Sequence, residues 1–191
     1  VLLDMGMGKT SIVLTAIVEL MYERFEVNRV LIIGPLRVAR TTWPEEIKKW
    51  DPLKGIRYSV MVGSAAERKA ALDADADIYI INRENVPWLV DQCGAAFGFD
   101  MVVIDELSSF KSWQTKRFKA LMKVRPFVKR IVGLTGTPSS NGLMDLFAEF
   151  KVLDMGKRLG RFIGQYRECY FRPDRMNGPV VYSYRLVQGA E

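Results

Sequence analysis

Short apolar runs alternate along this chain with segments of helical spacing. The apolar runs are rich in β-branched residues and span residues 1–3, 29–33, 56–62, 78–81, 101–105 and 130–134, of which the first is expected to be a shortened strand. Between and after them, residues 10–24 and 143–153 place apolar side chains on one side of a helix. Strands that alternate with helices predict an α/β fold, in which a mainly parallel sheet lies between two layers of helices. A chain of 191 residues is the size of one such domain.

The segment Gly-Met-Gly-Lys-Thr near the start of the chain is typical of loops that bind phosphate. Its glycines allow backbone N–H groups to close around a polyphosphate, and the following helix directs its positive end at the anion. In such a loop Lys9 contacts the β and γ phosphates, and the Thr10 hydroxyl holds Mg²⁺. The general pattern has a glycine where Leu3 stands, so a glycine turn before a helix is the alternative. The predicted nucleotide-binding residues are Met5, Gly6, Met7, Gly8, Lys9, Thr10 and Ser11.

The run at residues 101–105 leads directly into two acidic residues, Asp105 at its end and Glu106 just after it. Ligands gather at the carboxyl ends of parallel strands, so both carboxylates are expected beside the phosphate loop. We predict that Asp105 binds Mg²⁺ together with Thr10, and that Glu106 orients and deprotonates the attacking water. An isolated Asp-Glu pair could instead cap the next helix. With Lys9 present, we expect Lys9, Asp105 and Glu106 to form a catalytic set.

A further apolar run ends in the sequence Thr-Gly-Thr-Pro. Small hydroxyl residues at the end of a strand can donate hydrogen bonds to neighbouring carboxylates, and can thereby sense the γ phosphate. We therefore predict that Thr135, Gly136 and Thr137 couple hydrolysis to movement. The structural alternative is a strand end at Thr135 followed by a turn at Gly136 and Pro138.

The order of these motifs resembles that of the Swi/Snf-type ATPases, which belong to helicase superfamily two. The matching segments are Asp-Met-Gly-Met-Gly-Lys-Thr, Ile-Gly-Pro-Leu with Trp-Pro-Glu-Glu-Ile-Lys-Lys-Trp, Asp-Glu, Leu-Thr-Gly-Thr-Pro and Leu-Met-Asp-Leu-Phe. The resemblance implies a RecA-like, ATP-binding lobe at residues 1–170 and a second RecA-like lobe that is missing from this chain. The composition changes after residue 170: residues 172–179 indicate a loop and residues 180–187 a strand, so residues 171–191 are expected to form a loop and strand that lead to the second lobe. It also implies a motor that binds ATP and Mg²⁺ between the lobes and moves along double-stranded DNA.

This chain departs from the family pattern directly after Glu106. The family has Ala-His or Gly-His there, whereas this chain has Leu107 and Ser108 and contains no histidine. The resemblance therefore implies that the coupling contact made by that histidine falls to Ser108 or is absent.

Positive charge is concentrated between the two strands that carry the predicted motifs. The net charge of the chain is +6, and residues 107–144 contain eight basic and no acidic residues. Lys116, Lys119 and Lys123 share one face of a predicted helix, which is either a strip that binds phosphates or a solvated surface. A basic surface supports salt-dependent binding to a nucleic-acid backbone.

The resemblance adds further candidates for DNA contact. It implies that the helix start after Pro35, Leu36 and Arg37 holds a DNA phosphate, and that Asn82 ends a strand at another contact. The alternatives are an ordinary surface residue for Arg37 and a turn former for Asn82. The complete set of predicted DNA-binding residues is Pro35, Leu36, Arg37, Asn82, Lys111, Lys116, Lys119 and Lys123. Trp43 and Trp50 lie seven residues apart, which favours core packing on one helical face over base stacking.

Cysteine content and hydropathy argue against three classes of protein: zinc-binding, disulfide-linked and membrane-spanning. Cys93 and Cys169 are far apart and lack a Cys-x-x-Cys partner, which argues against a zinc site and a disulfide framework. The apolar runs are much shorter than the roughly 18 residues that span a membrane. We therefore expect reduced thiols, a cytoplasmic location and no membrane partner. Two other functions stay open: a P-loop ATPase that acts as the switch subunit of a restriction or repair complex, and a non-catalytic DNA-binding module.

Overall fold

The computed structural model describes residues 1–2, 7–50, 55–137 and 142–189. Met5, Gly6 and Pro138 of the predicted motifs lie outside these residues. The helices are α1 Lys9–Val18, α2 Trp43–Lys49, α3 Ala65–Asp73, α4 Val86–Cys93, α5 Lys116–Val124, α6 Leu146–Asp154 and α7 Ile163–Tyr170. The strands are β1 Val30–Gly34, β2 Tyr58–Met61, β3 Ile78–Asn82, β4 Met101–Asp105, β5 Arg130–Leu134, β6 Phe171–Asn177 and β7 Val180–Leu186. Within the described ranges, no helix combines the length and the apolar character that crossing a bilayer requires.

A five-stranded parallel sheet of order β2-β3-β1-β4-β5 forms the centre of the fold. Ile32 of β1 is level with Ile80 of β3 and with Val103 of β4. Every residue of β1 and β3 is buried. Strands of this kind are apolar along their whole length because helices cover both of their faces. The predicted α/β fold with a parallel sheet is confirmed.

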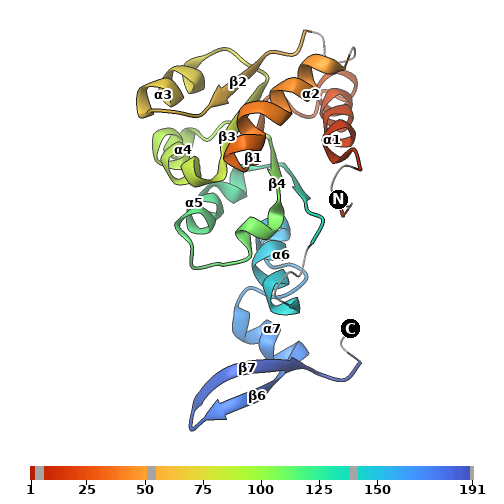
Figure 1. Cartoon of the computed structure of the whole chain (residues 1–191), viewed down its shortest axis with the longest axis vertical. Helices are drawn as coiled ribbons and strands as arrows, with labels where there is room; N and C mark the ends of the chain where they lie inside the picture. The colour runs from red at the N-terminus through yellow and green to blue at the C-terminus, as the bar shows by residue number, and fades with distance from the viewer. Residues whose placement is uncertain (3–6, 51–54, 138–141, 190–191) are drawn as a thin grey trace.

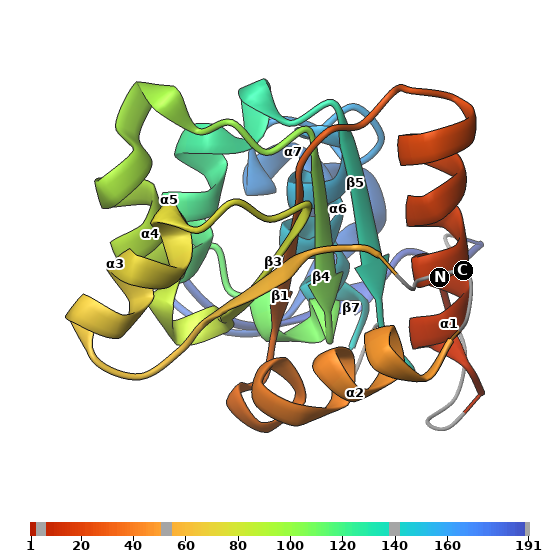
Figure 2. The same ribbon diagram turned by 90° about the horizontal axis from the view of Figure 1, so that it is seen from above.

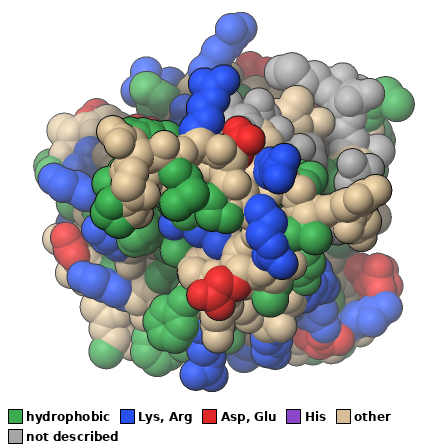
Figure 3. Space-filling view, turned by 90° about the horizontal axis from the view of Figure 1, so that it is seen from below, with side chains coloured by type: hydrophobic (Ala, Val, Ile, Leu, Met, Phe, Trp, Pro, Cys, Tyr) green, Lys and Arg blue, Asp and Glu red, His purple; other side chains and the backbone are tan. Residues whose placement is uncertain are grey.

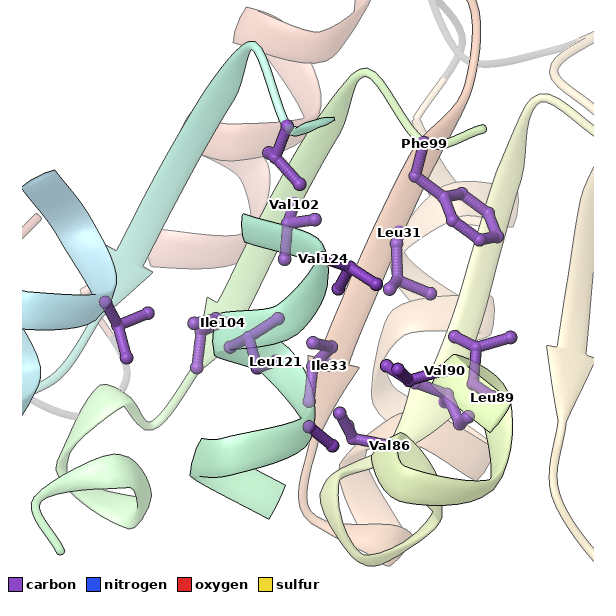
Figure 4. Packing of buried hydrophobic residues seen from close by; sticks show 14 of the residues in the cluster. Leu31, Ile33, Val86, Leu89, Val90, Phe99, Val102, Ile104, Leu121 and Val124 are labelled. Carbon is purple, nitrogen blue, oxygen red and sulfur yellow. The ribbon is translucent and has the colours of Figure 1, made fainter. Parts of the chain in front are cut away.

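The two faces of the sheet are covered by different helices (Figure 2). On one face, Leu14 and Ile17 of α1 and Trp43 of α2 belong to one core cluster with the sheet residues. On the other face, Leu31 and Ile33 of β1 pack with apolar side chains of α4 and α5 (Figure 4). Because side chains alternate along a strand, neighbouring residues of β1 enter the two different cores.

The start of the chain lies against the end of β5. Leu2 pairs with Thr135 in an isolated parallel bridge, and the Thr135 amide donates to the Val1 carbonyl at 3.3 Å. Within the described residues, the strand predicted at residues 1–3 is thus present as a single bridge. The bridge brings the residues before the phosphate loop to the carboxyl edge of the sheet, where β5 ends.

Trp50 does not share the core position of Trp43, so this part of the prediction is wrong. Trp43 is fully buried, whereas 42% of Trp50 is exposed and its indole N–H donates to Glu46 Oε2 at 2.8 Å. The reason is that α2 ends at Lys49 and Trp50 has extended backbone angles. Seven-residue spacing places two side chains on one face only while the helix continues.

The last part of the described chain is an antiparallel hairpin of β6 and β7 that extends from the lobe (Figure 1). β7 confirms the predicted strand, but the loop predicted at residues 172–179 is wrong, since β6 covers most of it. Proline, aspartate and asparagine disfavour strands locally, but pairing with the apolar and aromatic β7 outweighs that preference. A small cluster of Phe147, Tyr166 and Phe171 attaches the hairpin to α6 and α7.

Candidate active site

The phosphate-loop motif leads directly into α1. Gly8 is the N-cap of this helix and has φ 75° and ψ 21°, a left-handed conformation that glycine adopts without steric cost. Its carbonyl accepts hydrogen bonds from the Ser11 hydroxyl at 2.8 Å and from the Ile12 amide at 3.1 Å. Lys9, Thr10 and Ser11 therefore form the first turn, where backbone N–H groups have no partner within the helix. Met7 is exposed just before this turn.

Asp105 is the last residue of β4 and therefore lies at the carboxyl edge of the parallel sheet. Its Oδ2 accepts a hydrogen bond from the indole N–H of Trp43 at 2.9 Å. Burial raises the pKa of the Asp105 carboxyl, while the Trp43 N–H and the positive charge of Lys9 act in the opposite direction. The positive charge of Lys9, in the first turn of α1, is thus within electrostatic range of this carboxyl.

Glu106 joins the acidic motif to the Thr-Gly-Thr-Pro motif. Its backbone is left-handed, with φ 63°, at the point where β4 turns into the 3₁₀ turn Leu107–Phe110. Its Oε1 accepts hydrogen bonds from Ser108 Oγ at 2.5 Å and from Thr135 Oγ1 at 2.9 Å. The Thr137 amide in turn donates to Thr135 Oγ1 at 3.1 Å. The predicted hydrogen bond from a hydroxyl of the Thr-Gly-Thr-Pro motif to a neighbouring carboxylate is therefore present at Thr135, whereas Thr137 takes part through its backbone amide.

The predicted DNA-binding residues fall into an exposed group and an enclosed group. Lys116, Lys119 and Lys123 are exposed on α5, opposite the buried Phe118 and Leu121. Pro35, Leu36 and Arg37 follow the carboxyl end of β1, and the last two are exposed.

The enclosed group consists of Asn82 and Lys111. Only 7% of Asn82 is exposed, and its side-chain oxygen accepts from Asn85 Nδ2 at 2.5 Å. Lys111 is partly buried and forms an ion pair with Asp145 at 3.6 Å. Both side chains thus make contacts within the lobe itself.

Three residues near the site were not among the predicted site residues. Trp43 was assigned to the core alone, although its indole N–H reaches Asp105. Gly133 of β5 leaves room for Leu107, because a Cβ atom at Gly133 would lie 2.6 Å from Leu107 Cδ2. A glycine inside an apolar strand is the sequence signal for such a close approach.

The third of these residues is Glu149 of α6, of which 2% is exposed. Its Oε1 has no hydrogen-bond partner among the described residues. Burial, followed by the negative charges of Asp145 and Glu106, raises the pKa of Glu149 to about 7. The signal in the sequence was an acidic residue, Glu149, next to the apolar side of the helix predicted at residues 143–153.

The contact between Trp43 and Asp105 leads to a testable prediction. Replacing Trp43 with Phe keeps an aromatic ring in the core but removes the N–H donor that orients Asp105. Asp105 is predicted to bind Mg²⁺, and loss of a hydrogen-bond partner behind a metal ligand costs about 10- to 100-fold in metal affinity or activity. We expect a loss in this range for Mg²⁺-dependent nucleotide binding, measured by titration below the unfolding temperature. Trp50→Phe, which removes an exposed indole bonded to Glu46, serves as the matched control. Unchanged Mg²⁺ dependence in Trp43→Phe would contradict this role.

Comparison with known proteins agrees with this geometry. The SNF2-related domain matches residues 2–171 of the chain. Protein p41 of Acyrthosiphon pisum secondary endosymbiont phage 1 is 41% identical over 180 residues, which are 91% of this chain and 39% of that protein. The DNA excision repair protein ERCC-6-like of Mus musculus is 33% identical over 165 residues, covering 82% of this chain and 13% of that protein.

A solved structure shows the same relationship. The Sulfolobus solfataricus SWI2/SNF2 ATPase core in complex with dsDNA matches with a TM-score of 0.74 and 27% identity, covering 88% of this chain and 33% of that chain. The present chain therefore spans well under half of each of these proteins. The chain belongs to the SNF2-related domain family, and it has the fold of the N-terminal, RecA-like lobe of Swi/Snf-type helicase-like proteins.

Proposed function

We propose that this chain is the N-terminal ATPase lobe of a DNA-dependent translocase that couples ATP hydrolysis to movement on duplex DNA. The observation that carries the proposal is that Ser108 and Thr135 both donate hydrogen bonds to Glu106. The adjacent Asp105 has a carboxyl whose pKa depends on the charge of Lys9. A chain used only to bind DNA has no need for this convergence of three motifs at one edge of the sheet.

The residues present fit a magnesium ion. Mg²⁺ prefers hard oxygen ligands, and the Asp105 carboxylate at the sheet edge and the Thr10 hydroxyl in the first turn of α1 are of that kind. We assign these two groups as its protein ligands. When bound, the ion supplies positive charge to the oxygens of the β and γ phosphates.

Each remaining residue then has a distinct task. Lys9 and the first N–H groups of α1 bind the phosphates, and Trp43 orients Asp105. Glu106 accepts a proton from the attacking water. Because Ser108 and Thr135 both donate to Oε1, we assign the proton to the other oxygen, Oε2. Thr135 also connects this carboxylate to the end of β5, which gives the Thr-Gly-Thr segment a route for coupling hydrolysis to movement.

A second RecA-like lobe of the same polypeptide completes the proposal. We place the end of the first lobe near residue 170, where α7 ends and the hairpin begins. Motors of this class use an arginine from the second lobe, which contributes roughly 10³- to 10⁵-fold in rate. We therefore expect the 191-residue chain alone to bind nucleotide but to hydrolyse it barely above background.

DNA binding by α5 is tested by reversing its charge in the complete polypeptide. With Lys116, Lys119 and Lys123 changed together to Glu, we expect weaker duplex binding and unchanged ATP binding. The slope of log affinity against log salt is negative, and its magnitude should fall by about 0.9 for each DNA phosphate that α5 no longer neutralises. The matched control makes the same charge change at the exposed Lys48, Lys49 and Lys69 of α2 and α3.

The same preparations distinguish the alternative functions. Turnover that rises with duplex DNA supports the translocase. Turnover that ignores DNA supports a P-loop switch subunit of a larger complex, and DNA binding without turnover supports a non-catalytic module. If the α5 variant binds DNA like the control at every salt concentration, the α5 lysines do not bind DNA phosphates.

A further inference from the structure

The β6–β7 hairpin has an anchored base and an exposed remainder. Phe171 of β6 is buried against Tyr166, with ring centroids 5.2 Å apart, while every later residue of β6 is exposed. Leu186 and Tyr184 of β7 pack on the same small cluster, and Arg167 of α7 lies over the Tyr184 ring at 4.8 Å. One face of the hairpin base is thus occupied by the lobe.

The opposite face carries three arginines. Arg172 of β6 and Arg185 of β7 are directly opposite each other, and both are exposed. A register shift between Pro173 and Arg175 then pairs Arg175 with Ser183. Since Ser183 and Arg185 are two residues apart on β7, they point to one face, and Arg175 joins that face through the irregularity. Without it, strand alternation would place Arg172 and Arg175 on opposite faces.

This arrangement is unfavourable in the lobe by itself. Like charges placed directly opposite on neighbouring strands destabilise their pairing. Within the described ranges, no carboxylate forms an ion pair with Arg172, Arg175 or Arg185, and the nearby Asp174 accepts instead from Ser183 Oγ at 3.0 Å. Arg172 donates to the carbonyls of Glu168 and Phe171, both at 3.0 Å, which cancels no charge. The face therefore fits a partner that supplies several negative charges along a line.

We propose that the β6–β7 hairpin binds duplex DNA through Arg172, Arg175 and Arg185, as a contact separate from the α5 lysines. A two-stranded ribbon fits the major groove of B-DNA, which is about 12 Å wide, and arginine suits phosphate oxygens. This end of the molecule shows more basic than acidic side chains on its surface (Figure 3). The inference rests on the proposed function in taking DNA as the partner, but it concerns a different surface.

The test uses the complete polypeptide with Arg172, Arg175 and Arg185 changed together to Gln. We expect weaker binding to duplex DNA, and the magnitude of the negative slope of log affinity against log salt should fall by about 0.9 for each DNA phosphate that the hairpin no longer neutralises. ATP binding in the absence of DNA should not change. Thermal unfolding serves as the check on folding, and it should show equal or higher stability, since the opposed charges are gone.

Two further variants test whether the three arginines bind DNA specifically. Lys157, Arg158 and Arg161, exposed in the neighbouring loop, are changed to Gln as a control of equal charge. An equal loss of DNA affinity in that control would mean that diffuse charge binds DNA, and would overturn the proposal. Tyr182→Ser tests whether the hairpin binds protein instead of DNA, because the Tyr182 side chain is 68% exposed on the hairpin. If that variant alone changes an association of the polypeptide with itself or between its lobes, the hairpin is a protein contact.

The outcomes separate this inference from the proposed function. If DNA stimulates turnover in the unmodified protein and the arginine variant binds DNA equally well, the hairpin proposal fails and the translocase stands. If DNA does not stimulate turnover but the arginine variant binds DNA less tightly, the hairpin contact stands and the translocase fails.

Discussion

Glu106→Gln in the complete polypeptide is expected to bind ATP normally and to lose about 10²- to 10⁴-fold in turnover, the range for removing a positioned base. The amide has nearly the same size and can still accept hydrogen bonds from Ser108 and Thr135, so the local structure should persist. It cannot take a proton from water. Nucleotide affinity by calorimetry and steady-state phosphate release are the two measurements.

Two companion variants sharpen this test. Glu45→Gln changes an exposed acid of α2 and should leave turnover unaltered. Asp105→Ala should damage Mg²⁺-dependent binding itself, which Glu106→Gln should not. Normal hydrolysis by Glu106→Gln would assign the base to another group and would leave Glu106 as a structural link between β4 and β5.

Lys9→Ala is expected to weaken Mg²⁺-ATP binding about 10- to 150-fold. The basis is the loss of a hydrogen bond between charged groups, which contributes roughly 1.5–3 kcal/mol. Lys9 lies in the first turn of α1, and its positive charge opposes the rise that burial causes in the pKa of Asp105. Its removal should also raise the pKa of Asp105 further, because burial then acts with less opposition.

Calorimetric titration of ATP with Mg²⁺ measures this effect. Lys48→Ala, which removes an exposed lysine of α2, is the control and should bind like the unmodified protein. Equal affinities for Lys9→Ala and the control would exclude the phosphate-loop assignment, and with it the proposed ATPase.

The motifs could be predicted because each depends on local chemistry. A glycine at position 8 with φ 75° suits a tight turn before a helix, and Lys9 and Thr10 follow from the same pattern. Asp105 is the last residue of a buried strand and Glu106 follows it, so parallel topology brings both to the carboxyl edge of the sheet. The contacts of Thr135 with Glu106 could be expected for the same reason.

The two errors have different physical causes. Residues 172–179 have the composition of a loop, yet β7 pairs with them, because backbone pairing across strands does not depend on local composition alone. Trp50 lies seven residues after Trp43, but the helix ends at Lys49, so this spacing does not place Trp50 on the buried face of α2. The pairing of β6 with β7 could not be read from a window of neighbouring residues, whereas Pro52, two residues after Trp50, is a local signal that a helix ends.

The alternation of apolar runs and helices was sufficient to predict a parallel α/β lobe, because period and burial are properties of short segments. Contacts between residues that are distant in sequence could not be predicted from short segments. The bond from Trp43 to Asp105 joins residues 62 positions apart. The register shift that gathers three arginines on one hairpin face depends on how two strands pair. Both are set by packing of the whole chain, since hydrogen bonds and burial between distant segments exist only after the sheet and its helices have assembled.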